Sequence, residues 1–183
     1  MSSILKVSEI QDPTNGNTAL EVDSSGNAKV NNPFIQIYMA TGTYKTLTHD
    51  TTTKITDWTL DGASGITWDS TNDEIEIDVP GRYYVNFQAQ VYSSVNQIRN
   101  IHLRVLKNGT QLFGAYSFVG VTPTDVDLRH LTQNVSRIIN LAANDALTFE
   151  VFVQAGSGNP LLHPGDTTGG EGSTNVSVFR VSD

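Results

Sequence analysis

Apolar and polar residues alternate with a period of two along most of the chain, and this alternation limits the chain to β-structure. The clearest stretch is 82–92, in which every second residue is apolar. Successive side chains of a strand point to opposite faces, so such a stretch can bury one face. No stretch has the 3.6-residue period of an amphipathic helix. The expected strands are 34–40, 55–60, 74–79, 82–92, 100–107, 133–141, 146–154 and 175–181. Eight or more strands separated by turns predict an all-β sandwich or barrel.

Residues 82–92 predict a buried face and a second face of mixed character. The residues that we expect in the core are Tyr83, Val85, Phe87, Ala89 and Val91. The opposite side carries only uncharged residues, namely Tyr84, Asn86, Gln88, Gln90 and Tyr92. Two aromatic rings among amides fit neither a core nor a surface that meets only water. We therefore expect this second face to be covered, by a loop of the same subunit or by another copy of the chain.

The first 32 residues differ from the rest, and they divide the chain into an N-terminal arm, residues 1–32, and a head, residues 33–183. The arm consists of short alternating pieces between turn-forming segments, and the pieces at 19–22 and 28–30 predict a small hairpin. A hairpin alone is at best marginally stable, so the arm is expected to gain order by packing on a neighbour. The sequence therefore predicts an anchoring arm.

Two long connections interrupt the head, at residues 93–100 and 155–174. The second begins and ends in glycine-rich sequence, which argues against a strand. Loops of this length in a compact domain are usually contact sites or slack segments. Both loops are therefore candidate contact sites.

Composition excludes several classes of protein and partner. The 183 residues suffice for one domain with a hydrophobic core, and they include no cysteine, which excludes thiol nucleophiles and thiolate metal sites. The net charge of −8 repels nucleic acid and anionic lipid. The sequence also shows no signal peptide and no apolar run long enough to span a bilayer. We expect no nucleic-acid partner and no insertion into a membrane.

The sequence offers no convincing catalytic residue, cofactor or metal site, and we expect a protein that is not an enzyme. The four histidines, at positions 49, 102, 130 and 163, lie in four separate segments and lack the spacing of metal ligands. Glu74 and Glu76 alternate onto one face of a single strand. The two carboxylates of a glycosidase would instead face each other across a cleft. These features indicate a binding or structural protein.

Three segments of the head, in the same order, resemble the globular heads of the tumour necrosis factor and complement superfamily. They are EIDVPGRYYV at 76–85, IHLRVLKNG at 101–109 and SRIINLAANDALTF at 136–149. Two departures from the family pattern are the shorter spacing between Pro80 and Gly81 and the presence of Asn144 where glycine is usual. The resemblance implies a TNF-like jelly-roll sandwich of about 8–10 antiparallel strands. It also implies that the second face of 82–92 lines a threefold axis, which makes the chain a homotrimer.

The arm is similar to the leaders of tail-fibre and other virion-surface proteins of tailed phages, on the pieces ILKVSEIQ at 4–11 and ALEVDSSGN at 19–27. This similarity implies a bacteriophage structural protein, made in the host cytoplasm and displayed on the virion surface. A short chain with an arm and no long shaft favours a trimeric knob that decorates or cements the capsid. Its arm would bind other virion proteins, in the capsid or the tail.

An alternative function is that of a tail-fibre or spike head that binds a host-surface receptor or glycan. Recognition would use the loops at 93–100 and 155–174, whereas decoration would use the arm and the second face of 82–92. Trp58 and Trp68 are candidates for stacking on a sugar, and packing at the edge of a sheet would account for them equally well.

Overall fold

The computed structural model describes residues 9–11, 18–22, 24–26, 28–30, 32–39, 42, 44–93, 98–118, 130–156, 158–164 and 174–182. All regular elements in these ranges are strands. Their bounds are β1 (Glu9–Gln11), β2 (Thr18–Val22), β3 (Ala28–Val30), β4 (Phe34–Met39), β5 (Lys45–Thr46), β6 (Thr52–Lys54), β7 (Trp58–Ser64), β8 (Ile66–Asp69), β9 (Glu74–Ile77), β10 (Gly81–Tyr92), β11 (Ile98–Lys107), β12 (Thr110–Phe118), β13 (His130–Leu141), β14 (Ala146–Ala155), β15 (Leu161–Leu162) and β16 (Asn175–Ser182). Nothing in these ranges forms a helix able to cross a lipid bilayer.

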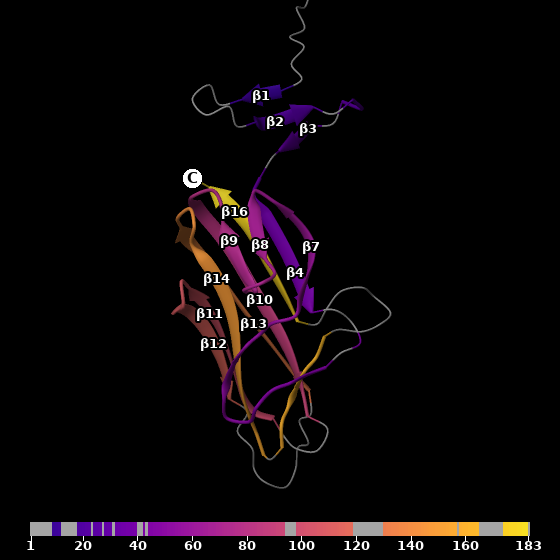
Figure 1. Ribbon diagram of the computed structural model, residues 1–183, viewed down its shortest axis with the longest axis vertical. Coiled ribbons are helices and arrows are strands. Elements are labelled where there is room, and N and C mark those ends of the chain that lie inside the picture. Colours follow the sequence, from indigo (N-terminus) through magenta and orange to yellow (C-terminus); the bar gives the residue numbers. More distant parts are fainter. Residues whose placement is uncertain are drawn as a thin grey trace, which may run out of the picture.

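Two antiparallel sheets pack face to face in the head (Figure 1). The β10 sheet has the order β5-β15-β10-β16-β4-β7, and β13 pairs with the whole length of β10, along the edge opposite to β15 and β16. The β14 sheet has the order β12-β11-β14-β9-β8, with β6 also paired to β14. The chain crosses repeatedly between the sheets: β9 lies in one, β10 in the other, β11 and β12 in the first, β13 in the second. Such crossings give a jelly-roll sandwich, which confirms the predicted fold class.

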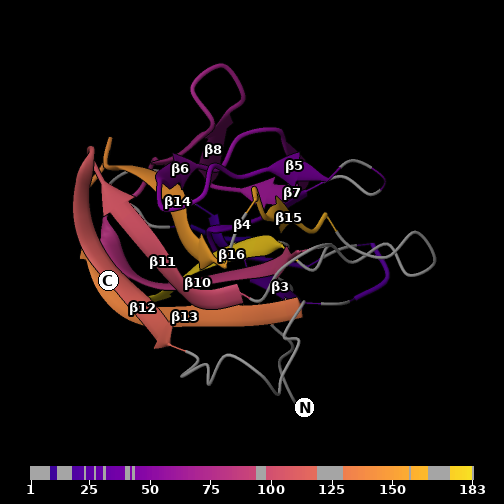
Figure 2. The same ribbon diagram turned by 90° about the horizontal axis from the view of Figure 1, so that it is seen from below.

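The sandwich is seen end-on in Figure 2, where β12 and β13 lie side by side at one margin. The core between the sheets contains the apolar side of β10, and the predicted core residues Tyr83, Val85, Phe87 and Val91 are all inaccessible to solvent. Across the sandwich, the Phe87 ring contacts Phe149 of β14 with 5.3 Å between centroids. This ring contact joins the two sheets at the middle of β10.

Trp58 lies on β7, the edge strand of the β10 sheet, and its ring belongs to the core. Its ring is buried edge-on against Phe87 and Phe149. The indole Nε1 donates a hydrogen bond to the Ile55 carbonyl at 3.1 Å, which satisfies the polar group of a buried tryptophan. Trp68 is partly buried and packs against the same core. The buried ring of Trp58 leaves no surface for a sugar, whereas its position on β7 agrees with the expected packing at the edge of a sheet.

Two of the resemblance motifs meet in one hydrogen-bonded network at the arm-proximal end of the β14 sheet. Asn108 and Gly109 have φ values of 51° and 76°, which confirms the predicted tight turn between β11 and β12. Asn144 has a φ of 66°, so it occupies the left-handed conformation that glycine adopts most readily and that asparagine tolerates. The Asp145 carboxylate accepts hydrogen bonds from the Asn108 side chain at 2.9 Å and the Ala142 amide at 2.8 Å. The network ties the two turns together.

Two of the predicted loops contain strand residues. The connection expected at 93–100 already enters β11 at Ile98, whose side chain is buried. The connection expected at 155–174 includes β15, Leu161–Leu162, which pairs with the end of β10 and with β5. Buried Leu162 fills a position next to Val91, so core packing outweighs the glycine-rich flanks. Residues 94–97, 157 and 165–173 lie outside the described residues.

The arm contributes a small sheet of its own, in the order β1-β2-β3, drawn above the sandwich in Figure 1. The predicted hairpin corresponds to β2 and β3, in which Leu20 pairs with Val30. The head begins where the chain joins β16: the Asn32 side chain donates to the Arg180 carbonyl at 2.7 Å, and the Arg180 amide donates to the Pro33 carbonyl at 2.9 Å. Residues 1–8, 12–17, 23, 27 and 31 of the arm lie outside the described residues.

Candidate assembly surface

The five residues predicted to form the second face all lie on the outward side of β10. Tyr84, Asn86, Gln88, Gln90 and Tyr92 are each partly exposed and alternate with fully buried neighbours. The antiparallel register extends this side sideways, onto β13 through one edge of β10 and onto β16 and β4 through the other. We call the outward side of β13, β10, β16 and β4 the layered face, because its residues form rows across the strands.

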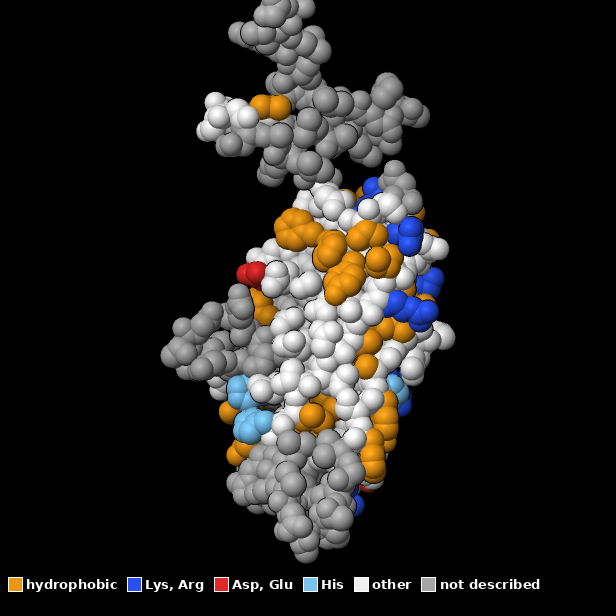
Figure 3. All heavy atoms as spheres, turned by 180° about the vertical axis from the view of Figure 1, so that it is seen from behind, with side chains coloured by type: hydrophobic (Ala, Val, Ile, Leu, Met, Phe, Trp, Pro, Cys, Tyr) orange, Lys and Arg blue, Asp and Glu red, His pale blue; other side chains and the backbone are white. Residues whose placement is uncertain are grey.

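The row nearest the arm is apolar. Tyr84 lies opposite Phe179 of β16 and Ile138 of β13, and Phe179 in turn lies opposite Phe34 of β4. The rings of Tyr84 and Phe179 are 4.9 Å apart between centroids. Phe34, Phe179 and Ile138 are 45%, 41% and 49% exposed, so no described segment covers this row. Figure 3 shows hydrophobic side chains gathered at this end of the face, toward the arm.

The middle rows are polar but uncharged. Asn86 lies between Ser177 and Ser136, and Gln88 lies between Asn175 and Asn134. The Asn134 amide donates to the Asn86 carbonyl oxygen at 2.7 Å, so adjacent rows are linked by side-chain hydrogen bonds. These rows form the pale central band in Figure 3. Amide and hydroxyl groups can exchange hydrogen bonds with a partner without the desolvation penalty that a charge would bring.

The far end of the face carries aromatic and imidazole rings. Tyr92 stacks on His130 with 4.6 Å between centroids, and His163 lies 6.3 Å from His130. Tyr44 joins them: its hydroxyl is 3.2 Å from His163 Nε2. The sequence did not predict this cluster, because its members come from four separate segments. The pairing of β15 with β10 brings His163, which directly follows β15, to the end of β10.

From the row of Tyr84 to the row of Tyr92, the layered face contains no Asp, Glu, Lys or Arg on its four strands. Sequence reasoning found only the β10 members of this face. The signal for the others was the same alternation, in Phe34, Gln36 and Tyr38 of β4 and in Asn175, Ser177 and Phe179 of β16. Their position beside β10 could not be read locally, because pairing partners lie far apart in the chain.

Outside this face, the carboxylates of Asp69 and Glu74 bind neighbouring groups of the protein. Asp69 accepts hydrogen bonds from the Asn72 side chain and from the Thr71 and Asn72 amides, which lower the pKa of its carboxyl. Glu74 lies 3.4 Å from Lys54 Nζ. No group of three His, Asp or Glu side chains suited to a metal occurs among the residues that the structure describes.

The fold is shared with solved structures, although neither a protein-family model nor a curated protein matches the sequence. The structure of Eiger TNF from S. frugiperda matches with a TM-score of 0.59 and 12% identity, over 83% of this chain and 94% of that chain. Murine APRIL at pH 5.0 matches with a TM-score of 0.57 and 13% identity, over 82% of this chain and 99% of that chain. These likenesses show a TNF-like jelly roll and confirm that part of the resemblance seen in the sequence.

Proposed function

We propose that the protein is a non-enzymatic virion knob, which assembles as a homotrimer through the layered face and attaches to a phage particle through its arm. The observation that carries the proposal is the layered face itself. It has exposed aromatic and aliphatic side chains in one row, uncharged polar rows beside it and no charged residue between Tyr84 and Tyr92.

The layered face has the composition of an interface core. Such cores are depleted in charged residues and enriched in aromatic ones, whereas surfaces that meet only water carry many charges. Phe34, Phe179 and Ile138 form one contiguous apolar row with Tyr84, and removing such a row from water favours association. The TNF-like fold and the resemblance of the β10 segment to strands that line a threefold axis support three copies rather than two.

The arm supports attachment to a particle. Its three short strands form a separate small sheet, and its sequence is similar to leaders of phage virion-surface proteins. Three arms on one trimer would bind together, so weak single contacts add up to firm attachment through effective concentration. Decoration or cementing of a capsid is the role that these features favour.

The homotrimer is tested by the substitution Tyr84→Arg, examined by sedimentation at micromolar concentration. Three unpaired charges buried around one axis should abolish assembly, because each costs several kcal/mol to desolvate, on the order of 3–5. Glu76→Arg, an exposed residue on β9 of the opposite sheet, is the matched control and should leave the trimer intact. A wild-type protein that sediments as a monomer contradicts the trimer.

The anchor is tested by deleting residues 1–32. The head has its own core, so its thermal midpoint and oligomeric state should change little, whereas incorporation into particles that lack the protein should be lost. Full-length protein added to the same particles is the control. Equal binding of the two would refute the anchor and the virion role assigned to the arm.

The alternative, a tail-fibre or spike head that binds a host-surface glycan, is favoured by the ring cluster at the far end. Tyr44, Tyr92, His130 and His163 offer exposed ring surface away from the arm, and sugar rings stack on aromatic faces. Location of the protein on the capsid or on the tail tip in images of the virion would decide between the two functions.

A further inference from the structure

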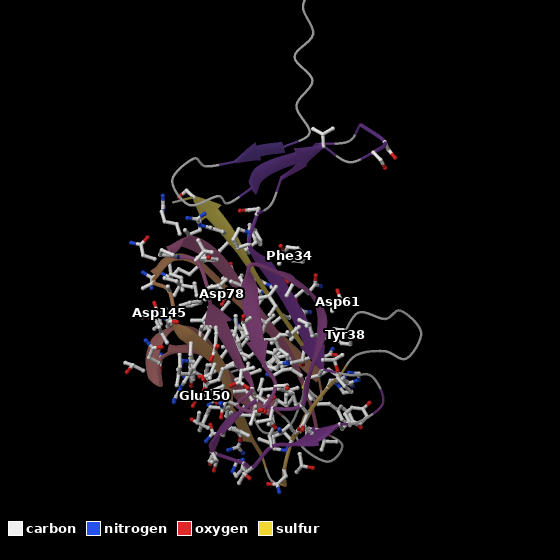
Figure 4. The ribbon with its side chains drawn as sticks, turned by 45° about the horizontal axis from the view of Figure 1, so that its top comes forward. Phe34, Tyr38, Asp61, Asp78, Asp145 and Glu150 are labelled. Carbon is white, nitrogen blue, oxygen red and sulfur yellow. The ribbon has the colours of Figure 1, made fainter. Side chains whose placement is uncertain are left out.

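A second group of exposed rings lies on β12, the edge strand of the β14 sheet. Tyr116 and Phe118 are 57% and 66% exposed, the highest values among the large hydrophobic side chains of the described residues. They are two residues apart on one strand, so both point outward, whereas Ala115 between them packs toward the core. Glu150 of β14 marks this outward side in Figure 4, across the head from Tyr38 of the layered face. The two rings therefore belong to a different surface.

Polar side chains of the neighbouring strands lie beside these rings. The register places His102 of β11 opposite Tyr116, and Asn100 of β11 opposite Phe118. Gln154 of β14 lies on the other side of Asn100. We call these five residues the ring platform. It combines two exposed aromatic rings with an imidazole and two amides, and it contains no Asp, Glu, Lys or Arg.

Gly114 allows the His102 ring to lie against Tyr116. A Cβ atom at Gly114 would collide with the Leu103 carbonyl oxygen and come to 3.0 Å from His102 Nε2, so glycine lets β12 approach β11 here. The His102 ring meets Tyr116 edge-on, with 5.8 Å between centroids and an angle of 84° between the rings. This contact orients Tyr116 before a ligand arrives, which reduces the entropy lost on binding.

His102 also supplies a hydrogen-bond donor. Burial and the charge of Arg104 lower the pKa of His102 below its ordinary value of 6.5, so the imidazole is neutral at pH 7. Its Nδ1 accepts a hydrogen bond from Arg104 Nε at 3.4 Å, which leaves the proton of the neutral ring on Nε2. Among the described residues, no acceptor binds this Nε2–H group. It can therefore donate to a bound molecule.

Asn100 places a buried acceptor without a partner in the platform. The residue is only 5% exposed, and its Nδ2 donates to Gln154 Oε1 at 2.8 Å. Its Oδ1 accepts no hydrogen bond from any residue that the structure describes, which costs stability until a donor arrives. The Gln154 Nε2 donor beside it has no described acceptor either. A hydroxyl both donates and accepts, so hydroxyl groups match this pair of unused amide atoms.

We propose that the ring platform binds a neutral saccharide chain along β12. Apolar faces of its sugar rings stack on Tyr116 and Phe118, and its hydroxyls bond to the two amides and the imidazole. The core of a protein interface would instead cover apolar side chains and leave few polar atoms unpaired. The absence of charged side chains from the platform favours a neutral ligand over an acidic one. This inference rests on neither the trimer nor the anchoring arm.

The platform lies where an external ligand can reach it. The turn at Asn108 and Gly109 is at the arm-proximal end of the β14 sheet, so β12 runs away from the arm and ends at Phe118 (Figure 1). A head attached by its arm presents this end outward. The platform is also distinct from the ring cluster around Tyr44 and Tyr92, because Tyr92 lies on the other sheet.

The first test uses the full chain on an array of bacterial capsular polysaccharides and O-antigens, both neutral and acidic. We expect binding to at least one neutral glycan. Titration calorimetry with a soluble oligosaccharide of that glycan should show about tenfold weaker binding for Tyr116→Ala and for Phe118→Ala. The matched control Tyr44→Ala removes an exposed ring elsewhere and should bind as the wild type does.

A second set of variants separates stacking from general apolar contact. Phe118→Leu keeps an apolar side chain but removes the flat ring, so it should lose about as much affinity as Phe118→Ala. Tyr116→Phe keeps the ring and should stay within about threefold of the wild type. Circular dichroism checks that each variant is folded. A folded Phe118→Leu variant that binds as tightly as the wild type overturns the stacking and with it the inference.

The remaining outcomes separate this inference from the proposed function. Binding to no glycan on the array, or to acidic glycans alone, overturns the inference and leaves Asn100 Oδ1 to a bound water. Binding that is lost in Tyr44→Ala and kept in Phe118→Ala overturns it in favour of the ring cluster. A change of oligomeric state in Tyr116→Ala would make the platform a contact between copies and overturn it as well. A monomeric wild type that binds a neutral glycan through Phe118 contradicts the trimer and supports the saccharide site.

Discussion

The outward faces of the two sheets follow the same alternation but carry different chemistry. Across the β14 sheet, Lys54, Glu150 and Arg104 lie in one row of alternating charge. Across the β10 sheet, the equivalent rows hold amides, hydroxyls and rings. A row of alternating charges is stable in water by itself, whereas an exposed row such as Phe34, Phe179 and Tyr84 is more stable when a partner covers it. A period of two therefore gives the direction of a side chain, and the residue type indicates what that side chain meets.

The largest expected effect on stability comes from comparing a ring in the core with a ring on the layered face. Phe87→Ala should lower the free energy of unfolding by about 3–5 kcal/mol, because it empties a fully buried site. Phe179→Ala removes a ring that is 41% exposed and should lower it by about 1 kcal/mol in the dissociated subunit, while weakening assembly. Urea denaturation at dilutions below dissociation measures both. Equal losses would place Phe179 in the folding core and break the comparison.

A middle-sized effect is expected at Asp145, a buried carboxylate in the turn that precedes β14. Burial alone would raise the pKa of Asp145, but hydrogen bonds from Ala142, Asn108 and Lys107 outweigh burial and hold this pKa below its ordinary value of 3.8. Asp145→Asn should cost about 1–3 kcal/mol of unfolding free energy at neutral pH.

The pH dependence has a definite sign. A depressed folded-state pKa stabilises the fold above the unfolded value and loses this contribution as pH falls through the folded value. The difference in stability between wild type and Asp145→Asn should therefore shrink as pH is lowered below about 3.8. Glu76→Gln, at an exposed position of β9, serves as the control for general acid effects. A difference that persists unchanged to pH 2 would show that the charge of Asp145 contributes nothing.

The smallest effect is expected on the outward face of the β14 sheet. Neutralising Glu76 and Glu150 together, as Glu76→Gln/Glu150→Gln, should change the free energy of unfolding by about 0.5 kcal/mol or less, because charges on a strand face that meets water contribute little to stability. Sedimentation should show an unchanged oligomeric state. A loss of assembly in this variant would assign the interface to the β14 sheet and reverse the comparison.

Local sequence signals predicted the strands that carry a strict alternation and missed those that do not. The stretch 82–92 matches β10 to within one residue. The strand β12 was missed because Gly114 interrupts its apolar pattern, and β15 was missed because a strand of two residues shows no period. Pairing with β11 and β10, respectively, makes both into strands.

The candidate surface was predictable along one strand but not across strands. Tyr84 and Tyr92 follow from the pattern of 82–92, whereas the contact of Tyr84 with Phe179 depends on which strands become neighbours. In the same way, the bulge at Asp61 depends on the register between β4 and β7, in which Gly62 pairs with Gln36 and Leu60 with Ile37. No local sequence pattern predicts it.

The junction of arm and head also determines how the molecule responds to mechanical force. Tension on the arm enters the head at Phe34 and runs along β4, which lies between β16 and β7 and is hydrogen-bonded to both. A pull along a strand held on both sides strains all its ladder bonds in shear at once, whereas a pull from a sheet edge would open them one by one. The head is therefore built to hold a load applied through its arm.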